Sequence, residues 1–351
     1  MPDRYLNYLY NNKYYNTKWL AWESGVSDGH DLSTAQSLTR AVLNKDTHTF
    51  DNLDWTTEPQ ESFLELCKER ALRIRDSYSH VALSFSGGSD SYFILDTFLK
   101  NNIKLDELVI CKDSLTNNSK FNYEIDNLAI PTVKLLTNIK ITMLSVDIND
   151  FEYIFYDDFM FNYGGVLIPD SFGPAQRLFQ PKNGSILING SWEPVIHLDS
   201  ELDKYYVNLF DTDGFMTALV NPNVIPFFTD PAFPKLHLKQ CHILKNHFRV
   251  NKIHIDFNKE YLYYKNTMIK LVRNGEKLNF FSSSPFFDKK KSTANKVDFV
   301  GHSKTNYFYK SIAKNDRQLF DYIFTNVSQT FQGIPLTRHL NGVEIGKYYI
   351  E

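Results

Sequence analysis

The sequence predicts an α/β fold, in which helices flank a parallel sheet and a mainly helical C-terminal region follows. Two observations support this prediction. Over residues 59–190, short apolar runs alternate with segments of helical periodicity, which is typical of βαβ units. Beyond residue 200 the pattern changes to proline-rich punctuation, and residues 237–249 and 305–328 have a helical pattern.

Three regions follow from these patterns. Residues 1–75 form an N-terminal extension, irregular with short helices up to about residue 60, and closed by an amphipathic helix that begins near residue 59 and runs to residue 77. Residues 76–200 form the α/β core, and residues 201–351 form the C-terminal region.

The core is predicted to contain four short strands with helices between them. Each strand is an apolar run ended by glycine or polar residues. The expected strands are 81–86, 108–111, 141–146 and 186–188, and the expected helices are 91–100, 122–128 and 149–162.

Composition and charge favour a protein of the cytoplasm. The chain has 351 residues, a net charge of −3 and three widely spaced cysteines, so a fully paired disulfide framework is excluded. A signal peptide and an apolar run long enough to span a membrane are both absent from the sequence, so no membrane partner is expected. The abundance of Phe, Tyr, Asn, Lys and Ile is common where coding DNA is AT-rich, as in many phages.

The segment Ser86–Ser91, with the sequence Ser-Gly-Gly-Ser-Asp-Ser, lies between a predicted strand and a predicted helix. Gly87 and Gly88 have no Cβ, so the backbone can turn tightly and approach an anion closely. The free N–H groups at the start of the following helix favour phosphate oxygens. Asp90 would repel phosphate unless a cation such as Mg²⁺ bridges the two. The segment therefore predicts a phosphate-binding loop.

A simpler interpretation is that the two glycines only make a turn and that Ser or Asp caps the helix. The full string of specified positions, placed between strand and helix, favours the functional interpretation. The sequence lacks the Gly-x-x-x-x-Gly-Lys-Ser/Thr loop and the Gly-x-Gly-x-x-Gly fingerprint, so two other common nucleotide-binding loops are excluded.

The loop Ser86–Ser91 resembles the pyrophosphate loop of the PP-loop ATP pyrophosphatases. The resemblance implies the adenine-nucleotide α-hydrolase fold and ATP with Mg²⁺ as cofactors. It also implies cleavage of ATP between the α- and β-phosphates, with adenylation of a carboxylate or carbonyl oxygen and release of pyrophosphate. The residues it implicates in binding the nucleotide are Ser84, Ser86, Gly87, Gly88, Ser89, Asp90, Ser91, Cys111, Lys112 and Gly190. It assigns catalysis to Asp90 and Ser91.

Residues 164–193 are similar to part of the synthetase domain of asparagine synthetase. Ile186–Gly190 matches a strand and its glycine, but Ser191-Trp192-Glu193-Pro194 replaces the acidic motif that follows in that family. Glu193 is the candidate second metal ligand beside Asp90, out of register by one position. The glutaminase half of asparagine synthetase needs an N-terminal catalytic cysteine, whereas this chain begins Met1-Pro2. Nitrogen would therefore come from ammonia, an amine substrate or a separate protein.

Two alternatives to an AMP-forming synthetase of small molecules stay open. One is a PP-loop enzyme that modifies a nucleotide or a nucleic-acid base, for which the basic run Lys289–Lys291 could contact a phosphate backbone. The other is a nucleotide-binding protein without turnover, which the replaced acidic motif near Glu193 allows.

Other residues have weaker functional interpretations. His237 and Cys241 share a helical face and could bind zinc, although they more often belong to a core. Cys111 could be a nucleophile, but a small buried apolar role is more common. A lysine contacting the α-phosphate could be any of Lys265, Lys270, Lys289, Lys290, Lys291 and Lys304.

Overall fold

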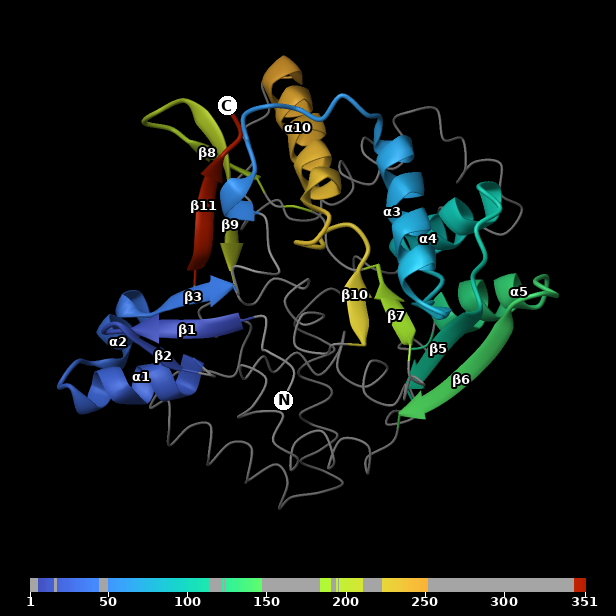
Figure 1. The fold of residues 1–351 in the computed structure, drawn as a ribbon, viewed down its shortest axis with the longest axis horizontal. Helices are drawn as coiled ribbons and strands as arrows, with labels where there is room; N and C mark the ends of the chain where they lie inside the picture. Colours follow the sequence, from blue (N-terminus) through green and yellow to red (C-terminus); the bar gives the residue numbers. More distant parts are fainter. Residues whose placement is uncertain are drawn as a thin grey trace.

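The fold was analysed in a computed structural model of the chain, shown in Figure 1. The residues that the structure describes are 6–15, 18–43, 50–113, 122, 124–146, 184–190, 194, 196–210, 223–251 and 344–351.

A five-stranded parallel sheet forms the centre of the fold, which confirms the α/β prediction. Its strands are β4 (His80–Ser84), β5 (Glu107–Asp113), β6 (Lys140–Val146), β7 (Ser185–Asn189) and β10 (Val224–Pro226). The strand order is β10-β7-β4-β5-β6, and every neighbouring pair is parallel. The chain proceeds from β4 through β5 to β6 on one side, and β7 then pairs with the other side of β4. The order therefore reverses between β4 and β7, which is where open α/β sheets bind ligands.

The four predicted strands are present, and the apolar side chains of β4, β5 and β7 are mostly buried. Strand β6 lies at the edge of the sheet, where Ile141 and Leu144 are half-buried and Met143 is exposed. In β7 all five residues are buried, as expected for a central parallel strand covered on both faces. The sequence analysis did not predict β10. It has only three residues and ends at Pro226, which resembles a loop in the sequence.

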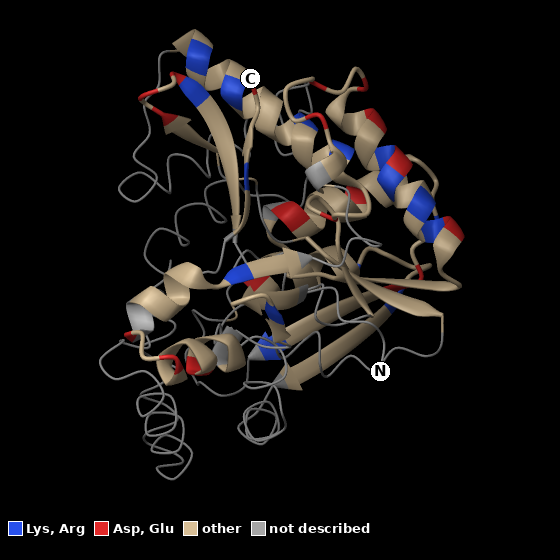
Figure 2. Cartoon of the chain, turned by 60° about the vertical axis from the view of Figure 1, so that its left-hand side comes forward, with Lys and Arg blue, Asp and Glu red and all other residues tan. Residues whose placement is uncertain are grey.

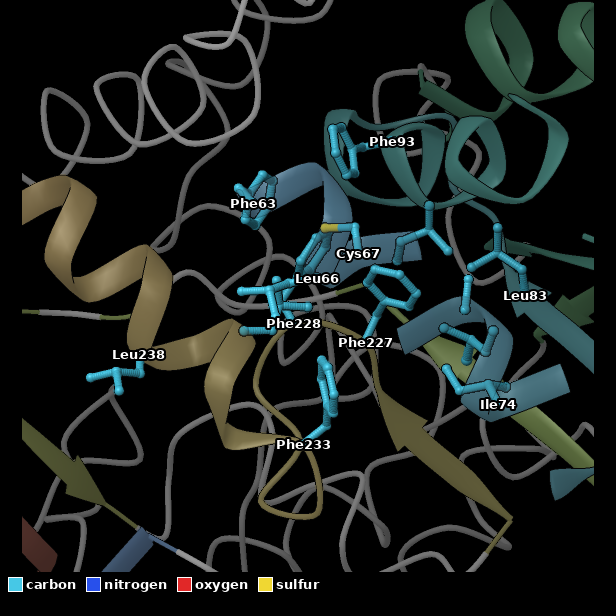
Figure 3. Close-up of a cluster of buried hydrophobic side chains, with 14 of the residues drawn as sticks. Phe63, Leu66, Cys67, Ile74, Leu83, Phe93, Phe227, Phe228, Phe233 and Leu238 are labelled. Atoms are coloured by element: carbon cyan, nitrogen blue, oxygen red, sulfur yellow. The ribbon is translucent and has the colours of Figure 1, made fainter. Parts of the chain in front are cut away.

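Two helices beside the sheet match the predicted periodicity. Helix α3 (Phe63–Ser77) begins at a capping box, in which Glu65 N–H donates to Ser62 Oγ and Ser62 N–H donates to a Glu65 carboxylate oxygen. Helix α4 (Ser89–Lys100) follows β4 directly. Figure 3 shows the apolar cluster between these helices and the chain after β10, where Phe63, Phe93 and Phe228 lie together.

Helix α10 (Pro234–Asn251) confirms the helix expected at residues 237–249. It packs against α3, and an ion pair joins α3 to the segment that leads into α10. In that pair, buried Arg70 contacts buried Asp230, and Arg70 also donates to the carbonyl of Pro226 at 3.2 Å. The ion pair therefore fixes the end of β10 against α3.

The connection from β5 to β6 contains a π-helix, η2 (Ile125–Ala129), followed by a short helix, α5 (Ile130–Val133). A helix was expected at residues 122–128, but not this winding. Pro131 has no N–H group, so a regular α-helical hydrogen bond cannot form at that position. The N–H of Ile130 instead donates to the carbonyl of Ile125, which closes the wider turn.

The N-terminal residues form a small antiparallel sheet that the sequence does not predict, together with short helices, which were expected in this region. Its strands are β1 (Leu6–Tyr10), β2 (Lys13–Tyr15) and β3 (Arg40–Leu43), in the order β2-β1-β3. Helices α1 (Lys18–Ser27) and α2 (Leu32–Leu38) connect β2 to β3, and a turn of 3₁₀-helix, η1 (Phe50–Asn52), comes after β3. The β1–β2 hairpin turns at Asn11 and Asn12, whose φ values of 47° and 59° suit a type I′ turn.

A third sheet combines segments far apart in the sequence. Strand β9 (Lys204–Phe210) pairs antiparallel with β8 (Ile196–Asp199) and with β11 (Glu344–Tyr349), which contacts β3. The described part of residues 201–351 therefore holds strands as well as helix α10. The helices expected at 149–162 and 305–328 lie outside the described residues. No helix in the described ranges is long and apolar enough to cross a membrane.

Candidate functional site

The loop Ser86–Ser91 lies at the carboxyl end of β4, at the point where the strand order reverses. Phe85 extends the pairing of β4, because its N–H donates to the carbonyl of Val109 on β5 at 2.8 Å. Gly87 then turns with a φ of +77°, a left-handed conformation that favours glycine. Gly88 is the N-cap of α4 and has no side chain to cap the helix. The start of α4 is therefore arranged as an anion-binding helix terminus.

Two serine hydroxyl groups lie side by side in this loop. Ser86 Oγ is 3.3 Å from Ser91 Oγ and accepts the N–H of Gly88 at 3.2 Å. Ser91 is buried and Ser86 is exposed, so the pair extends from the helix to the surface. The N–H of Gly88 therefore donates to the Ser86 hydroxyl in this structure, and it could donate to an anion oxygen instead.

Gly87 makes a close contact with the π-helix η2. A Cβ built on Gly87 would lie 2.6 Å from the backbone nitrogen of Ala129 and 3.0 Å from the Cβ of Leu128. Glycine is therefore required at position 87 both for its φ value and for space. The sequence does not indicate that Leu128 and Ala129 are neighbours of the loop, because nothing in their residue types predicts such a contact.

Gly190 reaches the same loop from the other side, at the carboxyl end of β7. A Cβ on Gly190 would lie 2.8 Å from Ile94 Cδ1 and 3.3 Å from both the carbonyl carbon of Asp90 and the nitrogen of Ser91. The structure therefore brings together two segments that the sequence analysis singled out, Ser86–Ser91 and Gly190. Glu193, the candidate second metal ligand, lies outside the described residues.

Asp90 is half-buried in the first turn of α4. Mg²⁺ in nucleotide sites is commonly held by one or two carboxylates, with substrate phosphates and water completing its oxygen ligands. One carboxylate in the loop that also contains Ser86 and Ser91 fits that requirement. The described residues contain no group of three or more His, Cys, Asp or Glu side chains that could hold a metal ion without a substrate.

Cys111 and Lys112 lie near the carboxyl end of β5, beside β4, so they share the sheet edge of the loop. Cys111 is half-buried. Lys112 Nζ forms an ion pair with Asp126 of η2 at 2.8 Å, and both side chains are well exposed. The π-helix thus contacts the loop Ser86–Ser91 through Ala129 and the end of β5 through Asp126.

His237 and Cys241, the candidate zinc ligands, lie in the core. Both are buried, and His237 packs against the rings of Phe50 and Trp55 with centroid distances of 5.8 and 5.9 Å. Neither ring nitrogen of His237 has a hydrogen-bond partner among the described residues. Burial lowers the pKa of His237 to about 3 and raises that of the Cys241 thiol. These properties are those of core residues and give no support to zinc binding.

The burial of His237 predicts a pH-dependent stability. Its pKa is lowered from 6.5 to about 3 by folding, so the unfolded chain binds a proton first as the pH falls. The free energy of unfolding is therefore unaffected by protonation of His237 above pH 6.5, and it decreases as the pH falls from 6.5 to about 3. His237→Leu should therefore raise the free energy of unfolding by about 2 kcal/mol more at pH 5 than at pH 7.5. Urea unfolding at both pH values measures this difference.

His30, which is exposed, provides the matched control for that measurement. His30→Leu should leave the difference in stability between the two pH values unchanged, because this side chain is in contact with water before and after unfolding. An equal effect of both substitutions would contradict the assignment to the buried ring.

Asp230, in the segment that follows β10, is held by structural contacts. Besides its buried ion pair with Arg70, it accepts the N–H of Ala232 at 2.8 Å. The candidate lysines at 265, 270, 289–291 and 304 lie outside the described residues. Figure 2 shows Lys and Arg interspersed with Asp and Glu along α3, whereas α10 carries Lys and Arg without an acidic residue.

Comparison with family models and with curated sequences gives no relative of this chain. No protein-family model matches the chain, and no curated protein has a significantly similar sequence. The fold and the loop are therefore interpreted from the residues of this chain.

Proposed function

We propose that the protein binds Mg²⁺·ATP at Ser86–Ser91 and is an AMP-forming synthetase. One observation carries the proposal: a Ser-Gly-Gly-Ser-Asp-Ser loop lies at the reversal point of a parallel sheet and opens directly into α4. Ligands of open α/β sheets bind at such points, and helix N-termini attract phosphate. The resemblance of the loop to that of the PP-loop ATP pyrophosphatases selects ATP among phosphate ligands.

The residues of the loop have distinct roles in the proposed reaction. The backbone N–H groups at Gly88 and the start of α4 bind oxygens of the β- and γ-phosphates. Ser86 releases the N–H of Gly88, which then donates to a phosphate oxygen. The hydroxyl groups of Ser86 and Ser91 also donate to phosphate oxygens. Asp90 holds Mg²⁺, which neutralises charge on the phosphates when it is bound.

In the chemical step, a carboxylate or carbonyl oxygen of the acceptor attacks the α-phosphorus. A bond forms between that oxygen and the α-phosphorus, and the bond from the α-phosphorus to the bridging oxygen breaks. The electron pair leaves with pyrophosphate, whose negative charge the loop and the start of α4 stabilise. The loop therefore binds the leaving group. An amine or ammonia then displaces AMP from the activated acceptor.

Asp90→Asn tests the role of the carboxylate. The substitution removes the negative charge that holds Mg²⁺ but keeps the shape of the side chain. We expect Mg²⁺·ATP to bind at least tenfold more weakly, and binding of ATP to lose most of its dependence on Mg²⁺. Isothermal titration with and without Mg²⁺ measures both effects, and release of pyrophosphate from ATP reports turnover.

Asp96→Asn is the control, because Asp96 is on the same helix and pairs with Lys100 at 3.0 Å. It should leave ATP binding unchanged. Unaltered binding in Asp90→Asn would refute the role of Asp90, and a wild-type protein that does not bind ATP would refute the proposed function. Binding by the wild type without release of pyrophosphate, across a broad set of acceptors, would indicate a nucleotide-binding protein without turnover.

A further inference from the structure

The π-helix η2 is an unusual winding in contact with the phosphate loop. π-helices are rare, have a less favourable geometry than α-helices and occur often at functional sites. Here the winding follows from Pro131, which cannot supply an N–H group, and from the hydrogen bond between Ile130 N–H and the Ile125 carbonyl. Figure 1 shows α5, which continues η2, beside β5 and β6.

The contact between η2 and the loop involves backbone on both sides. The Cβ position of Gly87 lies 2.6 Å from the backbone nitrogen of Ala129, and both residues are buried. A side-chain contact could adjust by changing its rotamer, but a backbone contact can change only if the turn itself moves. The position of Gly87 is therefore coupled to the winding of η2.

Thr132 fixes that winding. Its hydroxyl donates to the carbonyl of Leu128 at 2.7 Å, and the side chain is buried. Leu128 also lies close to Gly87, because a Cβ built on Gly87 would be 3.0 Å from the Cβ of Leu128. The hydroxyl of Thr132 thus holds the backbone unit between Leu128 and Ala129, whose nitrogen lies against the loop.

We propose that η2 positions the phosphate loop and that Thr132 is the residue that holds η2 in place. Wedged against Ala129, Gly87 keeps its left-handed turn, and this turn directs the N–H groups of Gly88 and the start of α4 to one anion. The identity of the anion as ATP rests on the proposed function. The positioning itself concerns the loop of the protein alone and can be measured without nucleotide.

Thr132→Val tests the proposal, because valine keeps the shape of threonine and lacks its hydroxyl. Hydrogen exchange of the amides from Gly88 to Ser91, measured without nucleotide, should become about tenfold faster. Mg²⁺·ATP should bind about tenfold more weakly by isothermal titration. Thr132→Ser retains the hydroxyl and should return both values to within about threefold of the wild type.

Thr97→Val provides a matched control. Thr97 is also buried, and its hydroxyl donates to the carbonyl of Phe93 four residues earlier at 2.9 Å, but this bond lies within α4 and away from the loop. A comparable loss of thermal stability is expected from both valine variants. Only Thr132→Val should accelerate exchange in the loop, so a general loss of stability is separated from positioning.

The outcomes distinguish this inference from the proposed function. Unchanged exchange in the loop of Thr132→Val, or equal acceleration in Thr97→Val, would overturn the positioning role. Faster exchange in a protein whose wild type does not bind ATP would support the positioning role and refute ATP as the ligand. If Thr132→Val does not fold, Pro131→Ala replaces it, since the added N–H group allows an α-helical turn and should accelerate the same amides.

Discussion

Arg70→Ala is expected to lower the free energy of unfolding by about 3–5 kcal/mol. The substitution leaves the carboxylate of Asp230 buried without its cationic partner, and it also removes the donor to the Pro226 carbonyl. A buried charge that loses its partner is among the most destabilising changes in a protein. Urea unfolding at neutral pH, followed by circular dichroism, measures the loss.

A neighbouring ion pair on the same helix gives the control. Arg73 pairs with Glu69 at 2.6 Å, but its side chain is 60% exposed, so Arg73→Ala should cost less than about 1 kcal/mol. Arg70→Met combined with Asp230→Leu should recover most of the stability, because neither charge then remains buried. A loss below about 1 kcal/mol in Arg70→Ala would contradict a buried ion pair that fixes the end of β10 against α3.

The Arg70–Asp230 pair also shows what a sequence reveals only in part. Asp230 lies after β10, in a proline-rich stretch of the sequence. Its partner lies 160 residues earlier, on a helix whose apolar periodicity gave no reason to expect a buried arginine. Long-range pairs of this kind depend on the packing of whole elements, which local patterns do not encode.

The centre of the fold was predictable because it is locally encoded. Strands β4 and β7 are short buried apolar runs that lead into glycine, and the glycines at 87 and 190 mark places where backbone approaches backbone closely. The capping box at Ser62 and Glu65 likewise indicates the start of α3. In these segments one short pattern determines one local structure.

The antiparallel sheets were not predictable in the same way. In the N-terminal sheet, Tyr8 and Tyr10 are buried on β1. The surrounding sequence is so rich in tyrosine and asparagine that it shows no clear alternation of apolar and polar residues. The best local signal was Asn11-Asn12, a pair suited to a type I′ hairpin turn. Strand β11 joins β9 across more than a hundred residues, so its pairing depends on contacts that no local pattern contains.

Gly87→Ala is expected to weaken the binding of Mg²⁺·ATP by about 100-fold or more, equivalent to about 2.7 kcal/mol. The added methyl group meets the backbone nitrogen of Ala129 at 2.6 Å, and alanine disfavours the φ of +77°. The loop must therefore move away from η2, and the N–H of Gly88 moves with it. Isothermal titration of the folded variant measures the loss.

Gly29→Ala separates the two causes of that loss. Gly29 has a φ of +93°, and a Cβ there would meet no atom within 4 Å, so its substitution adds backbone strain without a steric clash. It should cost about 1 kcal/mol of stability and leave ATP binding unchanged. Gly87→Ala should cost more stability, because the clash adds to the strain. If Gly87→Ala instead matches Gly29→Ala in stability and retains ATP binding, then the loop can shift freely, and the close contact with η2 does not determine how it binds phosphate.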